Sequence, residues 1–207
     1  MKIDLHVHCS EFSPCGRSPG EQVIESAIRK GLDALVFTNH FQFVPQGQLE
    51  MWNGRYAPFR ILNGIEVHAD EDDFIVLGVL DDALTSNSWR YERLHPFVRE
   101  RDGYLILAHP FRYHEAFAMD LESLPPDAIE CRSSNILPEH CERIIQLAQR
   151  LKAPIVCASD AHSLEKVGMW HIEFATMPQT ERELVEALRA GTFTCGPLGE
   201  QPAENAR

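Results

Sequence analysis

The sequence predicts an α/β fold in which a parallel sheet or barrel is covered by helices. Short apolar runs rich in β-branched residues alternate along the chain with segments of helical periodicity, and this alternation is typical of such folds. Hydrophobic residues make up 44% of the 207 residues, which is enough to bury one substantial core. We therefore expect a single domain over residues 1–196.

Eight runs have the length and the composition of buried strands. Helical segments lie between several of them, and this favours parallel pairing because two parallel strands need a crossover connection. In chain order the expected strands are Lys2–Val7, Ala34–Thr38, Ile61–Glu66, Phe74–Val79, Tyr104–Ala108, Ala128–Cys131, Ile155–Ala158 and Ile172–Ala175.

Three segments carry helix signals. Ser18-Pro19-Gly20-Glu21 offers an N-cap residue, a proline at the first helical position and a capping-box glutamate, and so predicts a helix through Lys30. Apolar periodicity predicts two further helices, over Pro138–Leu151 and Thr180–Ala190.

Two other segments lack such periodicity. Phe41–Phe59 is long, irregular and aromatic, and because a loop of this kind inside a compact domain is often functional, we interpret it as a candidate lid. The tail, residues 197–207, is poor in apolar residues and is expected to be disordered.

The charge balance argues against a polyanionic partner. Nineteen Lys and Arg against 31 Asp and Glu give a formal net charge of -12, so a nucleic-acid duplex would gain no counterion-release attraction. The six cysteines include no CxxC pair, which argues against a zinc finger or a disulfide scaffold. A strand-like segment follows Met1, and no run reaches the roughly 18 apolar residues of a membrane span. We expect a soluble, cytoplasmic protein with reduced thiols and no membrane partner.

Histidines and carboxylates gather where the expected strands end. Active sites of parallel α/β barrels are built at the carboxyl ends of the strands, so these side chains are expected to meet at one mouth. Imidazole nitrogens together with carboxylate oxygens suit Zn²⁺, Mn²⁺ or Fe²⁺, and a carboxylate can bridge two ions. The residues concerned are His6, His8, His40, Glu66, His109, Asp160 and His162.

The motifs around these residues resemble those of the polymerase and histidinol phosphatase (PHP) family. The resemblance spans nearly the whole chain, and the DLHxH and SDAH motifs at its two ends are the specific part of the signal. It implies a distorted (β/α)7 TIM-like barrel of PHP type with two to three divalent metal ions. The motifs are Asp4-Leu5-His6-Val7-His8, Thr38-Asn39-His40, Gly64-Ile65-Glu66, Ala108-His109-Pro110 and Ser159-Asp160-Ala161-His162.

The resemblance also implies which side chains hold each ion. Glu66 would bridge from the first ion to a second ion that His109 also binds. His40 and His162 would hold a third ion. The ligands of the first ion would be His6, His8, Glu66 and Asp160.

This chain departs from the family pattern at several positions. Cys15 and Asp73 stand where the family often has other ligands; both are candidate metal ligands, although Asp73 could instead belong to an acidic turn. Asn39 replaces the usual aspartate before His40, which would weaken the third position. His68 could reach the second ion. Glu130 stands where the family often has a glutamate, and a structural hydrogen-bonding role suits it equally well.

The expected reaction is hydrolysis of a small phosphomonoester or nucleotide. No Ser-His-Asp or Cys-His arrangement suggests itself, so the nucleophile is assigned to a metal-bridging hydroxide. Asp160 or His162 would protonate the leaving group. Arg17, Arg112 and Arg132 lie near the ligand motifs, and a guanidinium suits the non-bridging oxygens of a phosphate. Two alternatives stay open: an amidohydrolase-type C–N hydrolase and a non-catalytic structural or regulatory metal-binding domain.

Overall fold

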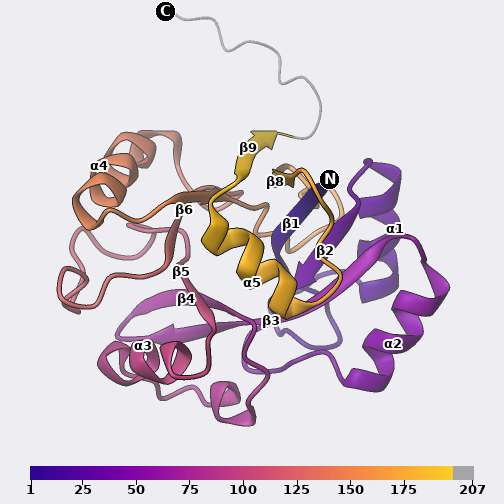
Figure 1. Ribbon diagram of the computed structural model, residues 1–207, viewed down its shortest axis with the longest axis horizontal. Coiled ribbons are helices and arrows are strands. Elements are labelled where there is room, and N and C mark those ends of the chain that lie inside the picture. Colours follow the sequence, from indigo (N-terminus) through magenta and orange to yellow (C-terminus); the bar gives the residue numbers. More distant parts are fainter. Residues whose placement is uncertain (198–207) are drawn as a thin grey trace, which may run out of the picture.

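Nine strands form one mixed sheet that curls until it is nearly closed into a barrel (Figure 1). The computed structural model describes residues 1–197. The strand order across the sheet is β7-β6-β5-β4-β3-β2-β1-β8-β9. The strands are β1 (Lys2–Val7), β2 (Ala34–Phe37), β3 (Arg60–Ala69), β4 (Asp72–Leu77), β5 (Tyr104–Leu107), β6 (Ala128–Arg132), β7 (Ile155–Cys157), β8 (Trp170–Phe174) and β9 (Phe193–Pro197).

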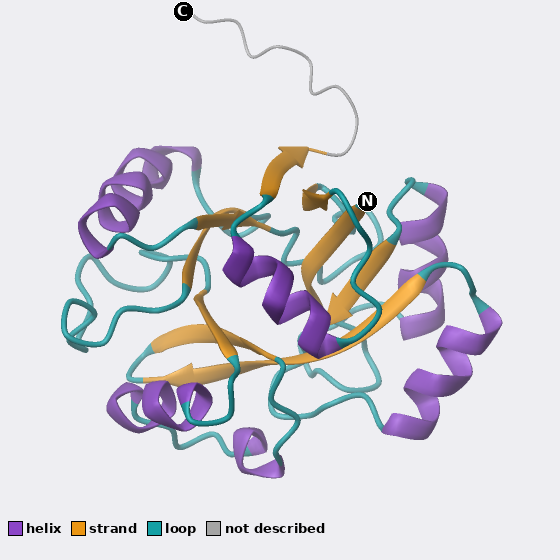
Figure 2. Cartoon of the chain, in the orientation of Figure 1, coloured by secondary structure: helices purple, strands orange, loops and turns teal. Residues whose placement is uncertain are grey.

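Helices α1 to α4 flank the sheet, whereas α5 crosses one end of the barrel (Figure 2). This arrangement confirms a barrel-like α/β fold with helices outside it, while the sevenfold repeat implied by the PHP resemblance stays a prediction. The helices are α1 (Gly20–Arg29), α2 (Gln46–Arg55), α3 (Tyr91–Arg99), α4 (Cys141–Leu151) and α5 (Glu181–Ala190), with short 3₁₀ helices η1 (Asp82–Thr85) and η2 (Pro138–His140).

The apolar side chains form three packed layers. One layer fills the barrel interior, where Leu62, Ile75 and Ile106 from three strands meet Leu184 and Leu188 of α5. A second layer lies between the sheet and helices α3 and α4. The third lies between the sheet and helices α1 and α2. Because α5 and the interior layer fill one end of the barrel, only the other end is free to carry polar groups.

The expectation of parallel pairing is wrong for part of the sheet. Strand β4 pairs antiparallel with both β3 and β5, and β8 pairs antiparallel with β1 and β9. The reason at β4 is a tight turn: only Asp70 and Glu71, both with positive φ, separate it from β3. A crossover between parallel strands needs about a dozen residues, so a two-residue connection can only form a hairpin.

An irregularity in β1 turns its histidines toward the barrel mouth. The register of β1 against β2 shifts between Asp4 and Val7. Ile3 and Leu5 belong to the interior layer, yet His6 also faces inward, contacting Glu130 of β6. A regular strand alternates its side chains between two faces, so a local change of register is needed to place both Leu5 and His6 inside.

The helix expectations need three corrections. The Ser18 capping box is wrong, because Pro19 is the N-cap residue and makes no side-chain cap; the carboxylate of Glu11 instead accepts from the Gly20 amide at 2.9 and 3.0 Å. The segment Phe41–Phe59, interpreted as a loop, contains α2. Helix α3 and strand β9 were not expected either.

Two remaining expectations concern membranes and the tail. Among the described helices, none is both long and apolar enough to cross a bilayer. The expected disordered tail, residues 197–207, lies outside the described residues except for Pro197, which ends β9.

Candidate metal centre

The candidate ligands converge at the barrel end opposite α5. His6 and His8 come from the end of β1, and His109 and Asp160 lie shortly beyond the ends of β5 and β7. Asp73 belongs to the same mouth because β4 is antiparallel: its register partner on β3 is His68, two residues beyond Glu66. The strand topology thus brings carboxylates and imidazoles from distant parts of the chain together.

Four buried side chains form a first group of candidate ligands, with their donor atoms within 4.8 Å of one another: His6, His8, Glu66 and Asp160. The Nε2 atom of His6 lies 3.1 Å from Glu66 Oε2 and 3.3 Å from Asp160 Oδ1. The Nε2 atom of His8 lies 3.2 and 3.4 Å from the same two oxygens. All four donor atoms therefore face one small volume.

The buried donor atoms of this group fit a divalent cation. Within the described residues, His6 Nε2, His8 Nε2 and Asp160 Oδ1 are buried without a hydrogen-bond partner. Leaving one such atom unpaired costs about 1–3 kcal/mol, and a cation between them would satisfy all three. Nitrogen and carboxylate donors in this mixture are those of Zn²⁺, Mn²⁺ and Fe²⁺ sites.

A second group shares Glu66 with the first and consists of Glu66, Asp73 and His109. The Nε2 atom of His109 lies 3.0 Å from Glu66 Oε1 and 3.8 Å from Asp73 Oδ2. The other oxygen of Glu66, Oε2, faces the first group. Glu66 therefore presents one oxygen to each group, which is the geometry that a bridging carboxylate requires.

The orientation of Asp73 is fixed by two polar neighbours. Its Oδ1 lies 2.8 Å from His68 Nδ1, and its Oδ2 accepts from the Tyr113 hydroxyl at 3.1 Å. Asp73 therefore faces the mouth from β4, and the acidic turn is formed by Asp70 and Glu71 instead. His68 contacts Asp73 in this structure.

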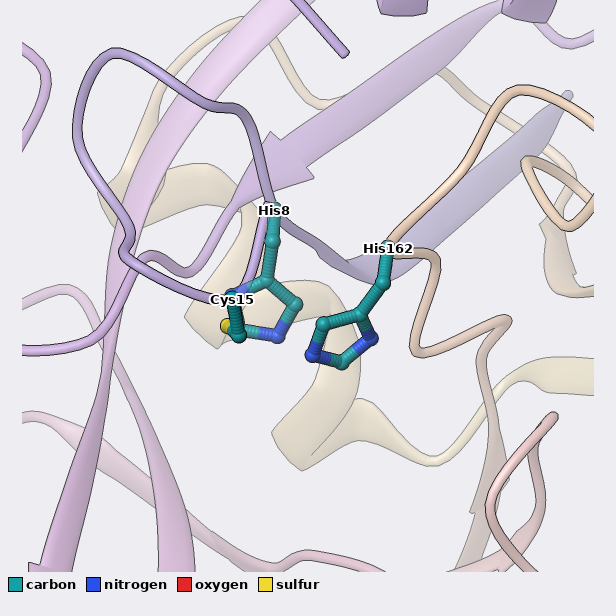
Figure 3. Close-up of side chains that lie close together, drawn as sticks. All are labelled: His8, Cys15 and His162. Atoms are coloured by element: carbon teal, nitrogen blue, oxygen red, sulfur yellow. The ribbon is translucent and has the colours of Figure 1, made fainter. Parts of the chain in front are cut away.

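A third group brings a cysteine to the mouth (Figure 3): His8, Cys15 and His162. The rings of His8 and His162 stack with their centroids 4.4 Å apart. His40 does not join His162 in this group; its ring stacks on the other side of His8, and its Nε2 lies 3.0 Å from Glu66 Oε2. His8 thus stacks with both His40 and His162, and a third ion held by His40 and His162 stays a prediction.

The electrostatic field of the site favours cations. Burial disfavours the charged form of His6, but Asp160 and Glu66 outweigh burial and raise the pKa of His6 well above its ordinary value. Burial likewise opposes the charge on Glu66, yet His6 and His40 hold the pKa of Glu66 well below its ordinary value. Since metal ligands must be deprotonated, a cation that binds here has to displace protons, and its affinity should rise with pH.

Solved structures share this fold at low sequence identity. PsfC from Pseudomonas syringae matches with a TM-score of 0.66 at 19% identity, over 94% of this chain and 90% of its own. A Bifidobacterium adolescentis protein proposed to be a metal-dependent phosphoesterase has a TM-score of 0.62 at 15% identity, over 90% and 95% of the two chains. An amidohydrolase from Chromobacterium violaceum, with bound sulfate and no metal, has a TM-score of 0.63 at 16% identity, over 99% of this chain and 100% of its own.

The sequence comparisons match one part of the chain to a family model. No curated protein matches the chain. Residues 138–193 match the family model described as PHP-associated. This match supports the resemblance to the PHP family over that part of the chain. The matched segment runs from η2 to the start of β9 and includes Asp160 and His162, so it covers the Ser159-Asp160-Ala161-His162 motif.

Of the three arginines predicted to bind substrate, Arg112 is the one whose guanidinium lies beside candidate ligands in the described structure. Its Nη1 lies 3.4 Å from His109 Nε2 and 3.8 Å from Asp160 Oδ2. The guanidinium of Arg132 contacts the Cys141 sulfur at 2.9 Å and lies over the Trp170 ring. Arg17 is exposed, and its backbone amide donates to the His162 carbonyl.

Three residues at the candidate metal centre were not predicted from the sequence. Ser13 Oγ lies 3.4 Å from His8 Nδ1 and 3.1 Å from the Cys15 sulfur. Asn135 donates to Asp160 Oδ2, and Tyr113 donates to Asp73. Only Ser13 carried a signal, because it lies two residues before the candidate ligand Cys15; Asn135 and Tyr113 lie in loops whose course the sequence pattern does not determine.

Proposed function

We propose that this protein is a metal-dependent phosphoesterase that hydrolyses a small phosphomonoester or a nucleotide. The observation that carries the proposal is Glu66, a buried carboxylate with one oxygen toward each of two ligand groups. Divalent ions held by such groups lower the pKa of water and stabilise both the attacking and the leaving oxygens of an in-line displacement. The ligands would be His6, His8, Glu66 and Asp160 for one ion, and Glu66, Asp73 and His109 for the other.

Arg112 would hold the phosphate group. It is the permanent positive charge beside the ligands, and its side chain is 33% exposed, so its guanidinium can reach a ligand that enters the mouth. Two of its N–H groups can pair with two non-bridging oxygens of one phosphate. This geometry favours an ester of phosphate over an uncharged amide.

His162 is the better candidate for protonating the leaving group. Asp160 is fully buried, with one oxygen among the first-group histidines and the other accepting from Asn135. The side chain of His162 is 22% exposed and lies beside His8 and Cys15 (Figure 3). A group that passes a proton to a departing alcohol must be able to touch it, and His162 meets this condition.

Metal content and phosphate release, measured together, test the proposal. The purified protein should contain at least two divalent ions per chain, and it should release phosphate from a panel of nucleotides and sugar phosphates. Release should stop with a chelator and return with Zn²⁺ or Mn²⁺.

The likeness to the Chromobacterium violaceum amidohydrolase makes C–N hydrolysis the second candidate. Metal-dependent turnover of amides without turnover of phosphate esters would replace the phosphoesterase proposal. Bound metal that raises the melting temperature without any turnover would instead favour the structural or regulatory role.

A further inference from the structure

Glu130 is a buried carboxylate that touches a different candidate ligand with each of its oxygens. It lies on β6, is 0% exposed, and points into the barrel mouth. Its Oε1 is 3.1 Å from His6 Nδ1. Its Oε2 accepts a hydrogen bond from the backbone amide of His109 at 2.9 Å.

The contact with His6 fixes which ring nitrogen is free. A carboxylate oxygen accepts a hydrogen bond, so the proton of a neutral His6 lies on Nδ1. The lone pair then lies on Nε2, the atom that faces Asp160 and Glu66 without a hydrogen-bond partner in the described structure. Carboxylates that accept from a ligating histidine in this way orient the ring and raise its basicity.

The contact with His109 holds a strained piece of backbone. His109 has a φ of 25°, a conformation that residues with a Cβ rarely adopt. The hydrogen bond from its amide to Glu130 fixes this conformation at the end of β5. With the backbone held there, the His109 ring places Nε2 3.0 Å from Glu66 Oε1.

We propose that Glu130 is a positioning residue that couples the two ion positions, because one rigid carboxylate sets a ligand of each. His6 belongs to the first group, and His109 to the second. Moving the Glu130 side chain disturbs a ligand of each position, so one substitution at Glu130 weakens both positions. This inference rests on the proposed metal-dependent function.

Ser13 supplies a matched control. Its hydroxyl lies 3.4 Å from His8 Nδ1, so it contacts a ligating ring through the nitrogen that does not face the first group, as Glu130 does with His6. Its other polar contacts are with Cys15 and the His40 amide. Among the described contacts of Ser13, none reaches a member of the second group.

The test is a calorimetric titration of chelator-treated full-length protein with Zn²⁺, for wild type, Glu130→Gln and Ser13→Ala. Loss of an outer partner of a metal ligand typically costs about 10- to 100-fold in affinity. Glu130→Gln should weaken both positions by this factor, whereas Ser13→Ala should leave the position formed by Glu66, Asp73 and His109 unchanged. Glu130→Gln with one or both affinities unchanged would overturn the coupling.

Two further measurements distinguish the possible outcomes: the number of Zn²⁺ ions that wild type binds, and the position of the His6 ring proton. Wild-type protein that binds fewer than two Zn²⁺ ions would overturn the proposed function and the coupling together, whereas two bound ions with unaltered Glu130→Gln affinities would overturn the coupling alone. If Glu130→Gln fails to fold, long-range ¹H–¹⁵N spectra of zinc-loaded wild type test whether Glu130 holds the His6 proton on Nδ1. They should show the His6 proton on Nδ1, and a proton on Nε2 would contradict the inference.

Discussion

The carboxylate of Asp160 lies close to histidines of both ligand groups and to the Arg112 guanidinium. Its Oδ1 lies 3.3 Å from His6 Nε2 and 3.4 Å from His8 Nε2. Its Oδ2 is 3.9 Å from His109 Nε2 and 3.8 Å from the Arg112 guanidinium. Burial opposes ionisation of Asp160, but the histidines outweigh burial and hold its pKa far below the ordinary value, so it offers a charged oxygen to a cation.

Asp160→Asn should therefore remove metal and activity while the fold persists. The amide keeps the shape but carries no charge, and we expect phosphate release to fall by more than about 100-fold, since even outer-sphere partners of metal ligands cost about 10- to 100-fold. Asp82→Asn, on the exposed surface of η1, is the matched control and should behave like wild type. Near-normal turnover and metal content in Asp160→Asn would contradict the ligand assignment.

Arg112→Ala should act on substrate binding. A hydrogen bond to a charged group contributes about 1.5–3 kcal/mol, so we expect KM for a phosphate ester to rise at least about 10-fold, measured by initial rates. Arg132→Ala is the comparison, because its guanidinium contacts Cys141 and Trp170; its KM should stay unchanged. The reverse result would move the phosphate-binding role to Arg132.

At the site, sequence reasoning could predict convergence but not detail. Each histidine motif directly follows an apolar run that predicts a strand. The prediction of a barrel was therefore enough to place these motifs together at one mouth. The inward turn of His6 depends on the irregularity in β1, and the approach of Asp73 depends on an antiparallel strand. Both result from tertiary packing, which local pattern does not encode. Metal binding by these residues stays a prediction.

At the scale of elements, the strands were easier to predict than the helices between them. Apolar β-branched runs mark β1 to β8 clearly. The segment before Phe59 was interpreted as a loop because α2 buries only Leu49 and Trp52, too few apolar positions to show a helical period. Helix α3 contains Pro96, which obscured its periodicity.

Packing of α2 on α1 gives a prediction at this scale. A Cβ on Gly20 would lie 2.5 Å from Trp52 Cη2, whereas one on Gly47 would meet nothing within 4 Å. Gly20→Ala should thus lower the free energy of unfolding by about 1–3 kcal/mol through overpacking. Gly47→Ala, which gains helix propensity without a clash, should not lower it. Urea unfolding of both variants measures the difference; equal stabilities would show that Trp52 moves aside freely.

At the scale of the whole molecule, bound metal and folding should be linked. The candidate ligands join β1, β3, β5 and the segment after β7, so an ion between them ties distant parts of the barrel together. A ligand at 100 times its Kd stabilises the folded state by about 2.7 kcal/mol. Chelation should therefore lower the melting temperature, and Zn²⁺ should restore it. A melting temperature indifferent to both treatments would mean that no ion binds the folded chain.

The pH dependence of stability should include a contribution from His171, which lies on β8 and belongs to none of the ligand groups. The side chain is buried, and its Nδ1 has no partner among the described residues. Burial lowers the pKa of His171, and the nearby Glu173 opposes this only in part. The unfolded chain, with the ordinary pKa near 6.5, binds the proton more readily than the folded chain.

Stability due to a neutral His171 should thus be fully present above pH 6.5 and be lost as the pH falls through the lowered folded-state pKa. Urea unfolding of chelator-treated wild type and His171→Gln at pH 7.5 and 5.5 measures this loss. The ligand histidines titrate in both proteins, so their effect cancels in the comparison. Wild type should lose more unfolding free energy than His171→Gln between the two pH values, and equal losses would show that His171 is not held neutral by burial.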